Sequence, residues 1–135
     1  MDVEAIHHVT LPVRDIDSSR RFYAEILGLR EIARPPFDFP GAWFQVGPNH
    51  IHLVVGDDPT FRESKHLDSR DIHFAVRVTS FRATLELLEA KGYGEDANDE
   101  RMKMKVSLRA TAGFPQIYIL DPDRNVIEIN AAALD

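Results

Sequence analysis

Two stretches of the chain alternate apolar and polar residues, and each is followed by a segment with helical periodicity. Ile6–Val13 and Asp71–Val78 alternate with the two-residue period of a half-buried β-strand. In the next segments, Asp15–Leu27 and Ser80–Lys91, apolar residues recur three and four positions apart, as on one face of a helix. A glycine then follows in both halves, and glycine readily adopts the left-handed conformation that ends a helix. The pattern therefore predicts the same strand–helix unit twice.

Further alternating runs predict three more strands after each helix. In the first half these strands are Arg30–Arg34, Ala42–Val46 and His50–Val55. In the second half we expect a strand near Tyr93, followed by Gln116–Leu120 and Val126–Asn130. Each half is thus predicted to be a β-α-β-β-β module, which makes the chain an α+β protein.

The module boundaries follow from the segments between the predicted elements. The first module spans about residues 4–56 and the second about 71–131, with a charged connector at 57–70. Residues 95–113 form a polar insertion, and irregular stretches of that length are often lids or mobile surface loops. Asp17 and Ser80 are the expected N-caps of the two helices, because their side-chain oxygens can accept hydrogen bonds from the first turn.

Four potential metal ligands fall on one side of their predicted strands. Successive side chains of a strand point to opposite faces, so parity assigns each residue to a face. His7 falls on the predicted core side of its strand, with the apolar residues. Opposite the apolar residues, on the side away from the helices, we expect His8, His52, His73 and Glu128.

Imidazole and carboxylate groups on one sheet face can hold a divalent metal ion. Two or three neutral imidazoles with one carboxylate bind Fe(II), Mn(II), Zn(II), Ni(II) or Co(II) and leave positions open for substrate or water. Such an ion can polarise a carbonyl or hydroxyl group of a substrate. Histidines on strands also occur as hydrogen-bonded structural residues, and His52 could be a general base instead. Parity alone leaves these alternatives open.

Composition excludes several classes of function. The chain has 135 residues, a net charge of −6 and no basic block, which disfavours nucleic-acid binding. The absence of cysteine excludes disulfides, thiolate metal sites and cysteine nucleophiles. No apolar run is long enough to span a membrane, and the acidic start Met1–Glu4 has no signal-peptide pattern. We therefore expect a cytoplasmic protein of one domain.

Motifs spread over nearly the whole chain resemble the vicinal-oxygen-chelate superfamily. This superfamily includes glyoxalases, fosfomycin-resistance enzymes, methylmalonyl-CoA epimerases, extradiol dioxygenases and bleomycin-binding proteins. The motifs are His8-Val9, Asp15–Ser19 before Phe22-Tyr23, Ile26–Leu29, His73–Val76, Tyr118–Asp123 and Val126–Ile129. The resemblance implies that the two modules pair into an open, cupped mixed β-sheet with the helices outside. It indicates the reaction only weakly, because this fold hosts several chemistries.

The resemblance also implies roles for individual residues. His8, His73 and Glu128 match three metal-binding positions of the family. His52 matches a fourth position, where glyoxalases I usually carry a glutamate, so simple glyoxalase I chemistry is in doubt. Tyr118 lies ten residues before Glu128, as an acid–base tyrosine does in extradiol dioxygenases.

Two further positions depart from the family pattern. Pro12 stands where glutathione-dependent glyoxalases tend to place a glutathione-binding arginine. Arg124 replaces the usual glycine of a turn, and we expect Asn125 to take the positive φ instead.

Two functional hypotheses follow. The first is a divalent-metal-dependent enzyme of lyase, isomerase or extradiol dioxygenase type. Its small substrate chelates the ion through two adjacent oxygens, while His52 and Tyr118 move protons. The second is a metal-free antibiotic-binding protein of the bleomycin-resistance kind, with an apolar pocket lined by Phe37, Phe39 and Trp43. The resemblance further implies a homodimer.

Overall fold

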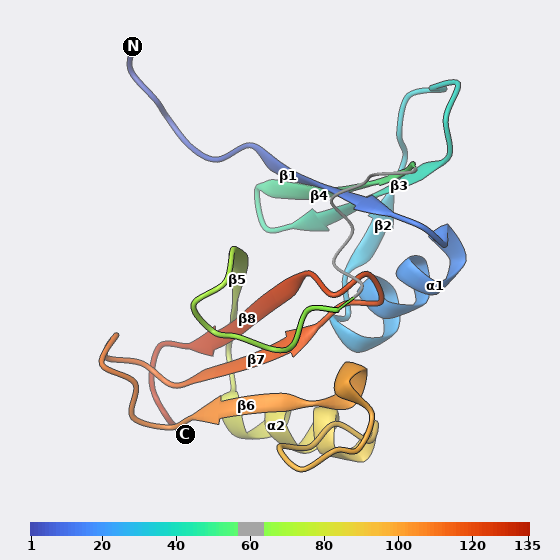
Figure 1. Cartoon of the computed structure of the whole chain (residues 1–135). Coiled ribbons are helices and arrows are strands. Elements are labelled where there is room, and N and C mark those ends of the chain that lie inside the picture. Colours follow the sequence, from blue (N-terminus) through green and yellow to red (C-terminus); the bar gives the residue numbers. More distant parts are fainter. Residues whose placement is uncertain (57–63) are drawn as a thin grey trace. The chain divides into compact units, whose positions relative to one another are not determined.

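The chain folds into two units that repeat one topology. The computed structural model describes residues 1–56 and 64–135, which divide into the units Met1–Phe61 and Arg62–Asp135. Each unit is built around a four-stranded mixed sheet (Figure 1). The predicted α+β class and the β-α-β-β-β repeat are confirmed. Residues 57–63 of the predicted connector lie outside the described residues.

The first unit orders its strands β1-β4-β3-β2, with β1 parallel to β4 and the other neighbours antiparallel. A π-helical turn, Phe22–Ile26, continues the first helix and buries Phe22 and Tyr23. The elements are β1 (His8–Val13), α1 (Ile16–Arg21), β2 (Arg30–Ile32), β3 (Gly41–Val46) and β4 (Asn49–Val55).

The second unit has the equivalent order, β5-β8-β7-β6, with β5 parallel to β8. A short 3-10 helix, Glu100–Met102, precedes its edge strand. The elements are β5 (His73–Val78), α2 (Phe81–Ala90), β6 (Met104–Ser107), β7 (Gln116–Leu120) and β8 (Val126–Ala131). In the part of the chain that the structure describes, no helix is long and apolar enough to cross a membrane.

The predicted position of the strand after α2 is wrong. β6 lies inside the polar insertion expected at 95–113, whereas Tyr93 is a buried residue outside any strand. β6 is the strand at the edge of this sheet and pairs with β7. Lys105 and Ser107 occupy one of its two faces, so the sequence of β6 is as polar as that of a surface loop.

Two local predictions are also corrected by turn hydrogen bonds. The N-cap of α1 is Asp15 rather than Asp17, because Asp15 Oδ1 accepts from the backbone N–H of Asp17 at 3.0 Å. The positive φ of 65° falls on Arg124 rather than Asn125. Asp121 holds Asn125 in place by accepting hydrogen bonds from both its backbone N–H and its side-chain amide.

One face of each sheet is apolar and buried, and this face fixes the register of the strands. Each large apolar side chain that is buried on this face stabilises the fold by about 1.5–3 kcal/mol. In the first unit the buried residues include Val13, Phe44, Ile51 and Leu53, together with Tyr23 of the π-helical turn. In the second unit they include Ile117, Ile119, Ile127 and Ile129, together with Phe81 and Leu88 of α2. The opposite faces, which we call the open faces, carry the candidate ligands.

Two side chains satisfy the N-terminus of α2. Ser80 Oγ accepts from the Ala83 N–H at 3.0 Å, as predicted for an N-cap, and donates to Asp135 Oδ2 at 2.6 Å. Asp135 Oδ1 also accepts from the backbone N–H groups of Phe81 and Arg82. These hydrogen bonds, that of Ser80 first, lower the pKa of Asp135 from 3.8 to about 2. The contribution of this carboxylate to the stability of the fold is therefore present above pH 3.8 and is lost as the pH falls toward 2.

We predict that Ser80→Ala lowers the free energy of unfolding by about 1 kcal/mol, because the Ala83 N–H loses its acceptor. Urea denaturation followed by circular dichroism measures this change. Ser64→Ala, at an exposed position, is the control and should change the value by less than about 0.5 kcal/mol. Equal effects of the two substitutions would show that the cap does not stabilise α2.

Candidate functional site

His52 lies between two aromatic rings on the open face of the first sheet. It is paired across the sheet with Trp43 of β3 and Thr10 of β1. The Trp43 ring stacks on His52 with a centroid distance of 4.0 Å, and the His8 ring stacks on it at 4.2 Å. The structure therefore brings two of the predicted ligands, His8 and His52, into direct contact.

The His52 imidazole is buried and has an unused nitrogen. Only 8% of the residue is exposed, and Nε2 has no hydrogen-bond partner among the described residues. Burial, followed by the charges of His8, His50 and His7, lowers the pKa of His52 from 6.5 to about 4. The ring is therefore neutral near pH 7, and a neutral imidazole is the form that binds metal ions.

Two further histidines surround this pair. His7 is exposed, and its Nδ1 lies 2.9 Å from His8 Nδ1, so its predicted place in the core is wrong. The reason is that β1 begins only at His8, and strand parity does not extend to the preceding residue. His50 is half-buried on β4, with its ring centroid 5.7 Å from that of His52.

The predicted pocket residues form an aromatic cluster beside Trp43. Phe37 and Phe39 belong to the loop between β2 and β3, and their rings stack at 5.0 Å. The Arg34 guanidinium lies over both rings, at 4.9 Å and 5.2 Å from their centroids. Phe37 lies 6.1 Å from Trp43, which in turn stacks on His52. Phe37 and Phe39 remain partly exposed, so this cluster is an aromatic surface next to the His52 ring.

Glu128 is the buried carboxylate of the second open face. Its Oε1 accepts from Asn130 Nδ2 at 2.7 Å, and its Oε2 accepts from the Tyr118 hydroxyl at 2.9 Å. Burial raises the pKa of Glu128, but hydrogen bonds from Asn130, Tyr118 and Gln116 and the charge of His73 lower it further than burial raises it. The net shift is downward, so Glu128 is an ionised carboxylate near pH 7.

His73 is oriented by a backbone carbonyl. Its Nδ1 lies 2.7 Å from the Asp71 carbonyl oxygen, which can only accept, so Nδ1 carries the proton. Nε2 then faces Glu128 Oε2 at 3.3 Å. In a neutral ring that nitrogen is an acceptor, so two acceptors face each other unless a proton or a metal cation lies between them. In metal-binding histidines, one ring nitrogen usually donates to a carbonyl or carboxylate in this way.

Tyr118 is held as a neutral phenol. Burial and its hydrogen bond to Glu128 raise the pKa of Tyr118 to about 12. Its ring is edge-on to His73, with the centroids 5.6 Å apart. Tyr118 can therefore donate a proton or a hydrogen bond near pH 7, but it does not form a phenolate base there.

Each unit thus presents two of the four predicted ligands. Among residues 1–56 and 64–135, no three His, Asp or Glu side chains are arranged to hold a metal ion. Sequence reasoning missed two partners, Asn130 and the Asp71 carbonyl. Asn130 could have been found, because it lies two residues after Glu128 and shares its face. The carbonyl has no side-chain signal in the sequence.

We predict that His52 titrates near pH 4 in the metal-free protein, because burial and the charges of neighbouring histidines oppose its protonation. His8→Ala should raise the pKa of His52 toward 6.5, since it removes both a charge and a covering ring. Carbon-13 NMR of the imidazoles measures both values. His66→Ala is the control, because His66 is not among the charges that act on His52. A wild-type pKa near 6.5 would contradict the described burial.

Comparisons with known proteins agree with this architecture. Residues 5–129 match the model of the Glyoxalase/Bleomycin resistance protein/Dioxygenase superfamily. A curated relative, Glyoxylase I 4 of Arabidopsis thaliana, is 28% identical over 131 residues, which are 96% of this chain and 71% of that protein.

Two solved structures have the same fold. A putative glyoxalase family protein from Bacillus anthracis superposes with a TM-score of 0.74 at 22% identity, over 97% of both chains. A mutant of the fosfomycin resistance protein FosX from Listeria monocytogenes, complexed with Mn(II) and 1S,2S-dihydroxypropylphosphonic acid, superposes with a TM-score of 0.70 at 22% identity. That match covers 98% of this chain and 95% of FosX. Because the family model spans most of the sequence, the chain belongs to the Glyoxalase/Bleomycin resistance protein/Dioxygenase superfamily.

Proposed function

We propose that the protein is a divalent-metal-dependent enzyme whose small substrate chelates the ion through two adjacent oxygens. The proposed ligands are His8 and His52 of the first unit and His73 and Glu128 of the second. The proposed metals are Fe(II), Mn(II), Zn(II), Ni(II) and Co(II), which all accept imidazole and carboxylate ligands. The proposed chemistry is that of a lyase or isomerase, with extradiol dioxygenase chemistry as the redox alternative.

The observation that carries the proposal is the meeting of His73 Nε2 and Glu128 Oε2 at 3.3 Å. The Asp71 carbonyl commits the other ring nitrogen to its proton, so Nε2 is the nitrogen that faces the ionised carboxylate. His73 and Glu128 could together hold a divalent cation in place of a proton. Asn130 and Tyr118 already hold the carboxylate in one orientation by hydrogen bonds, as is usual for a carboxylate that binds a metal ion.

The first unit supports the same proposal through His52. A buried nitrogen without a partner costs about 1–3 kcal/mol, and binding a metal ion would recover that cost. A base with a pKa of about 4 is poorly matched to proton abstraction near pH 7. This favours His52 as a ligand over His52 as a general base.

The remaining residues have roles that follow from their positions. When bound, the ion would polarise the substrate oxygens and stabilise negative charge on them. Tyr118 would donate a hydrogen bond or a proton from its hydroxyl, which now donates to Glu128. Trp43, Phe37 and Phe39 would provide an apolar wall that excludes water from one side of the substrate. The Mn(II) and vicinal diol in the FosX complex support this class of metal and substrate.

A metal-free binding protein is the second candidate function, and the aromatic cluster favours it. Phe37 and Phe39 stack in a loop with Arg34 over both rings, and such a surface suits a planar or apolar antibiotic. The test is whether an aromatic antibiotic such as bleomycin quenches Trp43 fluorescence in metal-free protein with micromolar affinity. The same protein would then bind no stoichiometric metal.

We predict that one divalent ion binds per chain and that Glu128→Gln weakens its binding by more than about 100-fold. The second-shell partners alone typically contribute 10–100-fold, so loss of a ligand costs at least as much. Isothermal titration calorimetry with Mn(II) and Zn(II) measures this affinity. His8→Ala should weaken metal binding in the same way as Glu128→Gln.

His66→Ala is the matched control for these variants, because this imidazole is 83% exposed and lies outside the proposed ligand set. It should bind the metal as tightly as the wild type. The proposal fails if the wild type binds no metal, or if Glu128→Gln and His66→Ala bind it equally well. Oxygen uptake with catechols and Fe(II) then separates a dioxygenase from a lyase or isomerase.

A homodimer is part of the proposal, since the superfamily implies one. We predict twice the monomer mass, 15.3 kDa per chain, in sedimentation equilibrium. Mixing His8→Ala with Glu128→Ala chains tests whether one ion takes ligands from two chains. If it does, the mixture regains a fraction of the metal sites that neither variant has. If all four ligands come from one chain, the mixture regains none.

A further inference from the structure

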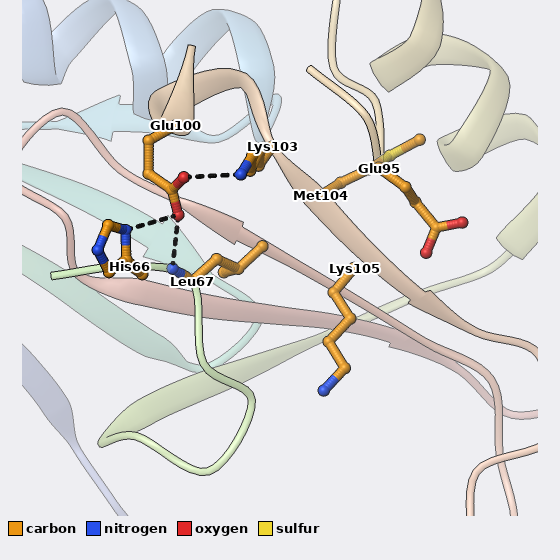
Figure 2. A pocket seen from close by; sticks show the side chains of 7 residues that line it. All are labelled: His66, Leu67, Glu95, Glu100, Lys103, Met104 and Lys105. Atoms are coloured by element: carbon orange, nitrogen blue, oxygen red, sulfur yellow. Dashed lines mark hydrogen bonds and ion pairs between the residues drawn. The ribbon is translucent and has the colours of Figure 1, made fainter. Parts of the chain in front are cut away.

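A polar cavity lies in the unit that contains Glu128. Its volume is about 360 Å³, within the range of small-molecule sites. The segment before β5, the 3-10 helix and β6 form its walls (Figure 2). Leu67 lines this cavity and also packs against Tyr118, Leu120 and Val126. The cavity therefore adjoins the open face that carries the proposed metal ligands.

Most of the charges in this cavity are already satisfied. Glu100 accepts from the Leu67 N–H at 3.1 Å, lies 3.0 Å from Lys103 Nζ and faces His66 Nδ1 at 3.4 Å (Figure 2). These hydrogen bonds, that of Leu67 first, lower the pKa of Glu100. Glu95 accepts from the Val106 N–H at 3.2 Å. Glu100 and Lys103 thus neutralise each other and fix the wall.

Lys105 is different, because no carboxylate pairs with it among the described residues. Its ammonium donates a hydrogen bond to the Ser69 hydroxyl, at 2.8 Å. The carboxylate that feels its charge is Asp68, which is exposed and engaged by Arg70. Figure 2 shows the Lys105 side chain extending away from Glu100 and Lys103. An ammonium group with three N–H donors therefore has capacity left for an anion.

The register of the second sheet relates Lys105 to the proposed metal site. Lys105 of β6 lies opposite Tyr118 of β7, and Tyr118 lies opposite Glu128 of β8. Directly paired residues project from the same face of a sheet, so all three side chains belong to the open face. Two strand spacings separate Lys105 from Glu128, which is about 10 Å.

We propose that Lys105 binds an anionic group of the substrate, so that the substrate is a metal chelator with a separate carboxylate, phosphate or phosphonate. This inference rests on the proposed function and adds the substrate class. The chelating oxygens would lie beside Glu128. The acidic group would lie a few bonds away, beside Lys105 and the Ser69 hydroxyl. Lys105 is exposed, so the acidic group would replace water at the ammonium.

Two matched ligands test the proposal. Both 2-hydroxyglutarate and 2-hydroxyvalerate carry the same chelating 2-hydroxy acid and a chain of the same length, but only the first has a distal carboxylate. Amide NMR titrations give their affinities for wild-type protein, without metal and with added Zn(II). We expect 2-hydroxyglutarate to bind about tenfold more tightly, as for one hydrogen bond to a charged group. It should also shift the amide signals of Lys105 and Ser69.

Substitutions assign that preference to Lys105. Lys105→Met should bind both ligands equally, whereas Lys105→Arg should keep the preference. Lys91→Met removes the same charge from an exposed position at the end of α2 and should also keep it. Equal binding of the two ligands to wild-type protein, no binding of either, or a preference that survives Lys105→Met would overturn the proposal.

Different results would contradict the proposed metal site and the proposed anion site at Lys105. If the preference depends on Lys105 but Zn(II) neither binds nor strengthens either ligand, the proposed metal site is wrong and the anion site stands. If Zn(II) binds and strengthens both ligands equally, the metal site stands and the role of Lys105 is wrong.

Discussion

The alternation of side chains along paired strands is the constraint on which the candidate ligands of both open faces depend. Ile117, Ile127 and Ile129 are buried on one face of the second sheet, and a slip of one residue would move all of them to the other face. The same register holds Tyr118 opposite Glu128. Hydrophobic burial on the reverse face therefore places the candidate residues on one face, and hydrogen bonds from Asn130 and Tyr118 then orient Glu128.

This constraint also explains how much could be predicted from the sequence. The bounds of β7 and the shared face of Glu128 and Asn130 follow from a two-residue period, which is a property of the backbone. β6 was missed because an edge strand with Lys105 and Ser107 on one face has no apolar pattern of its own. The N-cap at Asp15 and the positive φ at Arg124 depend on which turn hydrogen bonds form, and several choices fit the sequence equally well.

For the candidate site, too, some features could be predicted from the sequence and others could not. The residues proposed as ligands follow from parity and from the family motifs. Their protonation could not be predicted, because it depends on neighbours distant in the sequence. The low pKa of His52 arises from burial and from three other histidines, and the Trp43 ring that covers it comes from another strand. The proton on His73 Nδ1 is set by a backbone carbonyl, which no residue type at that position would reveal.

The candidate ligands of the two units have different electrostatic surroundings. The first unit keeps a neutral imidazole with an unpartnered nitrogen, and the second keeps a buried carboxylate facing an imidazole nitrogen. A histidine with a purely structural role would gain stability from a hydrogen-bond partner for that nitrogen. Glu128 accepts from the neutral donors Asn130 and Tyr118, and its Oε2 faces a ring nitrogen of His73. Each group is thus held in one orientation, which is what the proposed metal ion requires of its ligands.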